Sequence, residues 1–186
     1  MSPRIKLNAT GLEIFPLCLG GNVFGWTANE TESFKVLDAF AEAGGNFIDT
    51  ADVYSEWAEG NTGGDSESII GKWMASRGNR HEMVIATKVA KYSKRPGLSA
   101  ANINSAVEES LNRLQTDHID IYYAHEDDQK VELLETLSAF DALVKVGKVH
   151  IMGASNYSAA RLEEATKMSN ENDLNRYTAL QNEYNL

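Results

Sequence analysis

The sequence predicts an α/β protein built as a (β/α)8 barrel. Short apolar runs alternate with longer amphipathic stretches in units of about thirty residues, which is typical of parallel strands joined by crossover helices. Polar and titratable residues follow successive apolar runs directly, where a (β/α)8 barrel carries its functional groups. A doubly wound open sheet is the alternative, but Gly20, Gly21 and Gly25 do not have the GxGxxG spacing that it would require.

The individual elements follow from the periodicity and from the residues that end each run. Residues 5–17 are expected to form a hairpin with Asn8-Ala9-Thr10-Gly11 as its turn, and Leu17-Cys18-Leu19 a buried strand that ends at Gly20-Gly21. Further strands are expected over residues 46–48, 83–87, 119–123, 149–152 and 178–182. Helices are expected over residues 31–43, from Asp65 or Ser66 to Gly78, from Ser99 to Leu114, over 131–146, and from Ser158 to about residue 170.

Composition limits the classes of partner and compartment. Residues 1–186 are expected to form a single domain. The net charge of −10 argues against nucleic acid or an anionic membrane as the main partner. Neither an apolar run of about eighteen residues nor a secretory signal is found, so a cytoplasmic protein is expected. Cys18 is the only cysteine, which excludes an internal disulfide, and it is interpreted as a small core residue.

Four residues near the expected strand ends have the chemistry of proton transfer: Asp49, Tyr54, Lys88 and His125. A tyrosine with an unperturbed pKa of about 10 donates a proton poorly at neutral pH. A nearby ammonium group lowers that pKa, and a carboxylate can hold the ammonium in place. A histidine can orient a carbonyl oxygen. Such a set can protonate a carbonyl oxygen without a metal, while a cofactor supplies hydride to the carbon.

Several segments, in this order, resemble the motifs of the aldo-keto reductase family, in its bacterial-type branch related to potassium-channel β subunits. Thr10-Gly11-Leu12, followed by Leu19-Gly20, is similar to the hairpin that plugs the barrel floor in this family. The other matching segments are Asn46-Phe47-Ile48-Asp49-Thr50-Ala51-Asp52-Val53-Tyr54, Thr87-Lys88-Val89, Ile119-Asp120-Ile121-Tyr122-Tyr123-Ala124-His125, Gly153-Ala154-Ser155-Asn156 and Gln181-Asn182-Glu183-Tyr184-Asn185-Leu186.

The resemblance implies a role for each matching residue. Tyr54 would be the general acid, tuned by Lys88 and Asp49, and His125 would orient the substrate carbonyl. The implied cofactor is NADPH. Ser155, Asn156 and Gln181 would bind its nicotinamide amide, and Asp49 would also contact the cofactor. The expected function is therefore NADPH-dependent reduction of a small aldehyde or ketone to an alcohol.

Other interpretations remain open at this stage. The chain could be a regulatory or binding protein on the same scaffold, as potassium-channel β subunits are, or a truncated and inactive paralogue. Homo-oligomerisation is left open. His81, His118 and His150 are interpreted as structural residues, and no metal site is expected. Trp26 and Trp57 lie on expected rim loops, where they would either line a substrate pocket or stand as unpaired surface aromatics.

The sequence contains fewer expected strands than a barrel needs. A (β/α)8 barrel takes about 250 residues, whereas the motif order here runs only through the sixth strand. We therefore expect the 186 residues to be a barrel truncated after its sixth strand, as part of a longer protein. The resemblance implies that the missing part supplies the cofactor's phosphate contacts, so the short chain alone should bind cofactor weakly and show no turnover.

Overall fold

The centre of the molecule is a curved parallel sheet. In the computed structural model, which describes residues 4–7 and 10–184, six parallel strands lie side by side in chain order. Their register pairs Leu19 with Ile48, Ile48 with Ile85 and Thr87 with Tyr122. The strands are β3 (Leu19–Gly20), β4 (Phe47–Asp49), β5 (Val84–Val89), β6 (Ile119–Ala124), β7 (Val149–Ser155) and β8 (Tyr177–Gln181).

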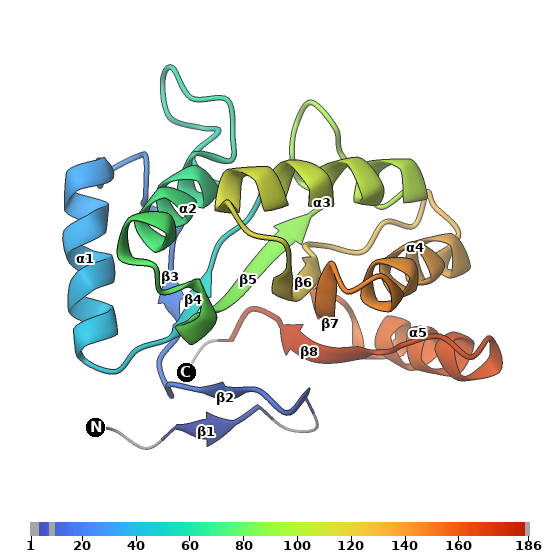
Figure 1. The fold of residues 1–186 in the computed structure, drawn as a ribbon. Coiled ribbons are helices and arrows are strands. Elements are labelled where there is room, and N and C mark those ends of the chain that lie inside the picture. Colours follow the sequence, from blue (N-terminus) through green and yellow to red (C-terminus); the bar gives the residue numbers. More distant parts are fainter. Residues whose placement is uncertain (1–3, 8–9, 185–186) are drawn as a thin grey trace.

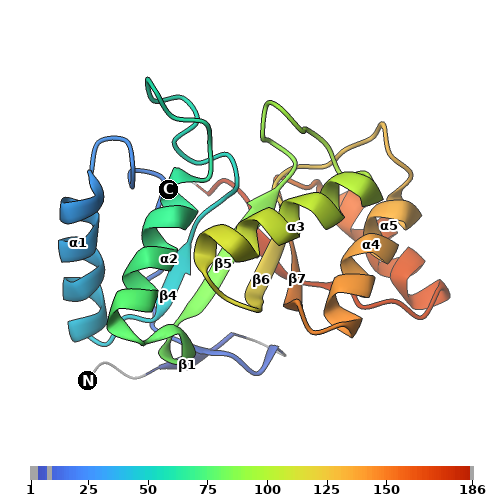
Figure 2. The same cartoon turned by 45° about the horizontal axis from the view of Figure 1, so that its top comes forward.

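The α-helices cover one side of this sheet. Figures 1 and 2 show α1 to α5 arranged along the outside of the curved strands. A doubly wound fold would place helices on both faces, so this arrangement confirms the prediction of a (β/α)8-type architecture. No helix in residues 4–7 and 10–184 is long and apolar enough to cross a membrane. The helices are α1 (Glu30–Glu42), α2 (Asp65–Arg77), α3 (Ala100–Leu114), α4 (Leu133–Lys145) and α5 (Ala159–Glu171), and a 3-10 turn follows α2 at Arg80–Glu82.

The two faces of the sheet bury different cores. The larger core lies under the helices and includes fully buried Trp73 and Phe140. The smaller one lies on the inner face, around Ile121 and Tyr123. The antiparallel hairpin β1 (Ile5–Lys6) and β2 (Glu13–Ile14) packs Leu7 and Leu12 against this inner core, as predicted for a hairpin at the barrel floor. Asn8 and Ala9 of the predicted turn lie outside the described residues.

Two predicted elements differ from the structure. The run 17–19 is not a buried strand, because its ladder begins only at Leu19 and Leu17 is 61% exposed. Neither Asp65 nor Ser66 caps α2; Gly64, with a φ of 75°, stands at the cap position. Ser66 instead donates a hydrogen bond to the carbonyl oxygen of Gly21 and accepts one from the Thr50 hydroxyl, so its side chain ties the helix to the sheet.

Candidate active site

The predicted site residues converge on the carboxyl end of the sheet. Asp49, Ser155 and Gln181 are the last residues of β4, β7 and β8. Lys88 lies near the end of β5, and His125 directly follows β6. Parallel strands bring their carboxyl ends to one edge, so residues far apart in sequence meet there. The long loops after β4 and β5 rise from this same end, at the top of Figure 1.

Lys88 is the centre of the site. Its side chain is completely buried, and its ammonium group donates hydrogen bonds to Asp49 Oδ2 at 2.6 Å and to the Thr50 carbonyl oxygen at 2.8 Å. A third hydrogen bond, 2.9 Å long, reaches the Tyr54 hydroxyl. The Tyr54 hydroxyl itself lies 3.5 Å from Asp49 Oδ2, a long contact for a donated hydrogen bond. The structure therefore brings an acid, an amine and a phenol into direct contact.

The Tyr54 phenol keeps its proton at neutral pH. Burial raises its pKa above the ordinary value of 10.0, and the Asp49 carboxylate adds to that rise. The Lys88 ammonium acts in the opposite direction but does not outweigh burial. The sequence argument considered only the lowering by Lys88, because the burial of Tyr54 depends on how the loop after β4 folds. Tyr54 is thus a protonated group with a cation beside its oxygen.

His125 faces the same site as an uncharged imidazole. Its side chain is buried, and its backbone N–H donates to the Val89 carbonyl oxygen at 2.9 Å. Burial, helped by the positive charges of Lys88 and Lys91, lowers its pKa to about 3. Its ring lies 6.1 Å from the Tyr54 ring between centroids, and its Nδ1 has no hydrogen-bond partner among the described residues. A buried unpaired nitrogen of this kind is available to a ligand.

The predicted amide-binding residues lie on the neighbouring strand ends. Asn156, held at a φ of 56°, donates from Nδ2 to the His125 carbonyl oxygen at 2.8 Å and to Ser155 Oγ at 3.0 Å. Gln181 donates from Nε2 to Asp49 Oδ1 at 3.1 Å. Side-chain amides and a hydroxyl offer both donors and acceptors, which suits the carboxamide of a nicotinamide ring. Asn185 and Leu186, at the end of the Gln181 motif, lie outside the described residues.

The comparison with known families agrees with this arrangement. Residues 16–186 match the family model described as "Aldo/keto reductase family". The chain belongs to this family. Three similar proteins, each aligned over most of this chain, illustrate the kind of relative that it has.

One relative, the uncharacterized oxidoreductase YrpG of Bacillus subtilis, is 40% identical over 86% of this chain and 51% of its own length. Norsolorinic acid reductase B of Aspergillus parasiticus and aryl-alcohol dehydrogenase [NADP(+)] of Phanerodontia chrysosporium are each 34% identical, over 95% of this chain and 49% of their own lengths. The chain thus spans about half the length of these curated relatives.

Two aromatic side chains lie next to Tyr54 at the edge of the candidate site. The rings of Trp26 and Trp57 meet edge to face with centroids 5.7 Å apart, and Trp57 meets Tyr54 at 6.1 Å. Both tryptophans are half exposed, at 51% and 50%. The two indole rings contact each other beside Tyr54, so they are not the unpaired aromatics that the sequence also allowed, and a role in lining a substrate pocket stays a prediction.

The ion pair between Glu67 and Arg113, on the helix side of β5, was not identified from the sequence. Glu67 of α2 is fully buried, accepts a hydrogen bond from Arg113 Nε at 2.6 Å, and accepts another from the Thr87 hydroxyl at 2.5 Å. Thr87 precedes Lys88 and points to the opposite face of β5. The pair therefore fixes the backbone that carries Lys88. No periodicity in the sequence links Glu67 to a residue on α3.

Proposed function

We propose that this chain carries the proton-transfer machinery of an NADPH-dependent reductase that converts an aldehyde or ketone to an alcohol, with Tyr54 as the proton donor. The contact that carries this proposal is the 2.9 Å hydrogen bond from the buried Lys88 ammonium to the Tyr54 hydroxyl. Asp49, at 2.6 Å from the same nitrogen, fixes the ammonium group. The set supplies an acid together with a counter-charge for the base that it becomes.

The direction of the Tyr54 pKa fits this role. Because burial keeps the phenol protonated, the resting site holds the acid form. Negative charge grows on the Tyr54 oxygen as its proton leaves, and the Lys88 ammonium already lies within hydrogen-bond distance of that oxygen. The attraction is stronger for the developing phenolate than for the neutral phenol. It therefore lowers the barrier more than it stabilises the resting state.

His125 would position the carbonyl rather than protonate it. With a pKa of about 3, its imidazole carries no excess proton at neutral pH. A neutral imidazole still has one N–H group that can donate a hydrogen bond to a carbonyl oxygen. The adjacent rings of Tyr54 and His125 would thus approach the same oxygen, one as proton donor and one as an orienting group.

The cofactor would be held at the ends of β7 and β8. Ser155, Asn156 and Gln181 would bind the carboxamide of the nicotinamide ring, and Asp49, which Gln181 contacts, would lie beside it. When bound, the reduced nicotinamide supplies a hydride to the carbonyl carbon. NADPH rather than NADH is proposed because one relative's name specifies NADP(+).

The substrate class proposed is an apolar or aromatic carbonyl. The pair Trp26 and Trp57 presents aromatic surface next to Tyr54, and aromatic faces bind flat apolar rings. One similar protein is named as an aryl-alcohol dehydrogenase, and an aryl alcohol carries an aromatic ring, which supports an aromatic carbonyl as the substrate class.

Replacing Tyr54 with Phe tests the proposal. The test is made in a protein that contains this chain within a complete barrel. The variant removes the hydroxyl and keeps the ring, so the rate of carbonyl reduction should fall by about a hundredfold or more. Cofactor binding, followed by NADPH fluorescence, should stay nearly unchanged. Tyr92→Phe is the matched control, because Tyr92 lies close to Gly63 and Lys94 and is not one of the candidate site residues. A Tyr54→Phe protein with full activity would remove Tyr54 as the donor, and a wild type that binds NADPH without any turnover would favour a binding protein.

A further inference from the structure

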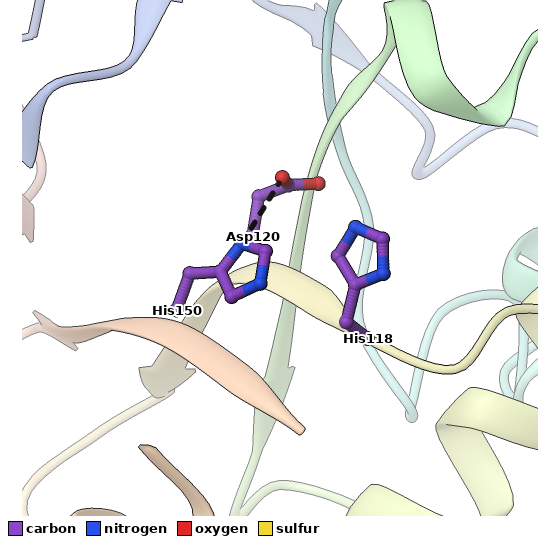
Figure 3. A group of neighbouring side chains, drawn as sticks. All are labelled: His118, Asp120 and His150. Atoms are coloured by element: carbon purple, nitrogen blue, oxygen red, sulfur yellow. Dashed lines mark ion pairs between the residues drawn. The ribbon is translucent and has the colours of Figure 1, made fainter. Parts of the chain in front are cut away.

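A second cluster of polar side chains lies at the opposite end of the same strands. His118 directly precedes β6, Asp120 is the second residue of β6, and His150 is the second residue of β7. Each of these residues offers one ligand atom, and these atoms all lie within 4.8 Å of one another. Figure 3 shows the two imidazole rings side by side with the carboxylate beside them. Adjustment of the side chains alone can bring them to a common ion.

The carboxylate is already held in place by the protein. Asp120 Oδ2 accepts a hydrogen bond from Arg80 Nη2 at 2.8 Å and another from the Ile85 backbone N–H at 2.9 Å. These contacts leave Oδ1 facing His150, whose Nδ1 lies 3.7 Å away. The β6–β7 register pairs Ile119 with Val149 and Ile121 with Ile151, so Asp120 and His150 lie beside each other on adjacent strands.

One of the two imidazoles is oriented in the way that metal-binding histidines usually are. His118 Nδ1 lies 2.6 Å from Asp117 Oδ1, so this carboxylate favours the tautomer that presents Nε2 as the free acceptor. A ligating histidine commonly donates its other N–H group to a carboxylate in this manner. The His118 ring stacks on the His150 ring with centroids 4.7 Å apart and an angle of 24° between the planes. The two rings thus lie against each other beside Asp120 (Figure 3). Because a ring nitrogen binds an ion in the plane of its ring, one ring would have to turn for both nitrogens to meet a common ion.

We propose that His118, Asp120 and His150 form a binding site for a divalent first-row transition metal ion, with Zn²⁺ as the probe. Two imidazole nitrogens and one carboxylate oxygen are a ligand set that zinc accepts, with further positions left to water. His150 is 48% exposed at its side chain, which gives an ion access from solvent. The Arg80 guanidinium next to Asp120 opposes the ion's charge, so the affinity should be moderate rather than that of a closed structural zinc site.

The site is separate from the candidate active site. His118 and His125 stand at the two ends of β6, and seven residues of extended chain correspond to about 23 Å. An ion bound at the histidine pair could not touch the carbonyl or Tyr54. Its effect would be to link the starts of β6 and β7. Binding to the folded state alone would stabilise the chain by an amount that grows with the logarithm of the ion concentration above the dissociation constant.

The test is Zn²⁺ binding by the purified chain without a polyhistidine tag, measured by isothermal titration calorimetry. The wild type should bind one ion per chain, and His118→Gln and His150→Gln should each weaken binding by about tenfold or more. His81→Gln is the matched control, since His81 is an exposed histidine outside the cluster. Both substituted residues reach solvent, so the variants should fold, and circular dichroism checks this. NMR signals of the His118 and His150 rings should shift with Zn²⁺ while those of His81 do not.

Two results would overturn the proposal. One is the absence of binding at millimolar Zn²⁺, and the other is binding that survives in both cluster variants. The second result would place the ion elsewhere, for example at the candidate active site. Cys18 is a poor competitor, because burial raises the pKa of its thiol to about 12 and thereby keeps the thiolate scarce.

Discussion

Asp49 and Asp52 lie three residues apart at the end of β4, yet their carboxylates meet opposite surroundings. Asp49 is paired with Lys88 at 2.6 Å and accepts a hydrogen bond from Gln181. Asp52 is only 1% exposed, and neither of its carboxylate oxygens has a hydrogen-bond partner among the described residues. Burial, with the nearby charge of Glu67, raises the pKa of Asp52 to about 7. The Asp49 carboxylate is therefore paired with Lys88, whereas the Asp52 carboxylate lowers the stability of the folded chain when it ionises.

The Asp52→Asn variant should therefore be more stable than the wild type at pH 8. In the unfolded chain Asp52 loses its proton near pH 3.8, but in the folded chain it keeps the proton up to about pH 7. Between these values the folded state binds more protons, so stability falls as pH rises, and the loss is complete above pH 7. We expect a gain of about 1–3 kcal/mol at pH 8 from urea unfolding and almost none at pH 4.

Asp38→Asn is the control for this comparison. Arg77 and Trp73 donate hydrogen bonds to Asp38, and the Arg77 contact is the main cause that lowers the pKa of this carboxyl to about 2. Its ionised form is favoured in the folded state, so its replacement should not stabilise the protein at pH 8. Equal stabilisation by both substitutions would mean that a general reduction of negative charge, rather than the burial of Asp52, causes the effect.

At the scale of single residues, the groups at or near the ends of strands could be identified from the sequence, whereas contacts fixed by packing could not. Asp49, Lys88 and His125 could be predicted, because alternating strands and helices bring strand ends together. The Gln181–Asp49 hydrogen bond joins residues 132 positions apart and depends on the curvature of the sheet. The lack of a hydrogen-bond partner for the Asp52 carboxylate among the described residues depends on the path of the loop after β4. Neither feature leaves a local pattern in the sequence.

At the scale of elements, α2 and α3 pack at backbone distance. A Cβ atom added at Gly71 of α2 would overlap the Arg113 carbonyl oxygen of α3 and would lie 2.7 Å from the Leu114 carbonyl carbon. The absence of a side chain here lets the helices approach closely enough for Arg113 to reach Glu67. Gly71 thus contributes to the buried ion pair that supports β5 and Lys88.

Replacing Gly71 with Ala should destabilise the protein. Glycine-to-alanine changes inside helices usually stabilise by about 1 kcal/mol. Here the new methyl group has to push two backbones apart, so we expect a net loss of about 2 kcal/mol or more in the free energy of unfolding. Gly20→Ala is the control, because its Cβ atom would meet only the Asn22 side chain at 3.8 Å. A stabilised Gly71→Ala variant would show that the two helices separate at little cost.

Helix boundaries followed from the sequence where a side chain marks them. Ser99 and Ser158 cap α3 and α5 by accepting hydrogen bonds from Asn102 N and Arg161 N, as the serine positions predicted. The capping residue of α2 was predicted wrongly as Asp65 or Ser66, because Gly64 provides a left-handed backbone conformation and no capping side chain. A cap made by conformation alone is not distinguishable from an ordinary loop glycine.

At the scale of the whole molecule, the two clusters of polar side chains lie at opposite ends of the sheet. The candidate active site lies where β4 to β8 end. His118 and His150 lie at the starts of β6 and β7, at the other end of the strands, and the β1–β2 hairpin lies below the sheet in Figure 1. The barrel-type architecture could be predicted because strict alternation leaves few topologies for a parallel sheet. The contact between residues at the starts of β6 and β7 could not be predicted, because it depends on the register of β6 against β7.

The position of each strand in the sheet predicts how its backbone amides exchange with solvent. β6 pairs with both β5 and β7, and every one of its residues is buried. In the part of the chain that the structure describes, β8 pairs with β7 alone, and Leu180 is 54% exposed. Opening β8 breaks fewer contacts than opening β6, so its amides should exchange much faster.

Hydrogen–deuterium exchange followed by mass spectrometry tests this order. Peptides from β5, β6 and β7 should keep their protons longest, and those from β8 and from the β1–β2 hairpin should lose them first, since the hairpin has only short strands. The β3 peptides are the internal control, because β3 is also paired on one side in the described sheet. Protection of β8 equal to that of β6 would contradict an open edge, and would mean that another segment or a second molecule pairs with β8 in solution.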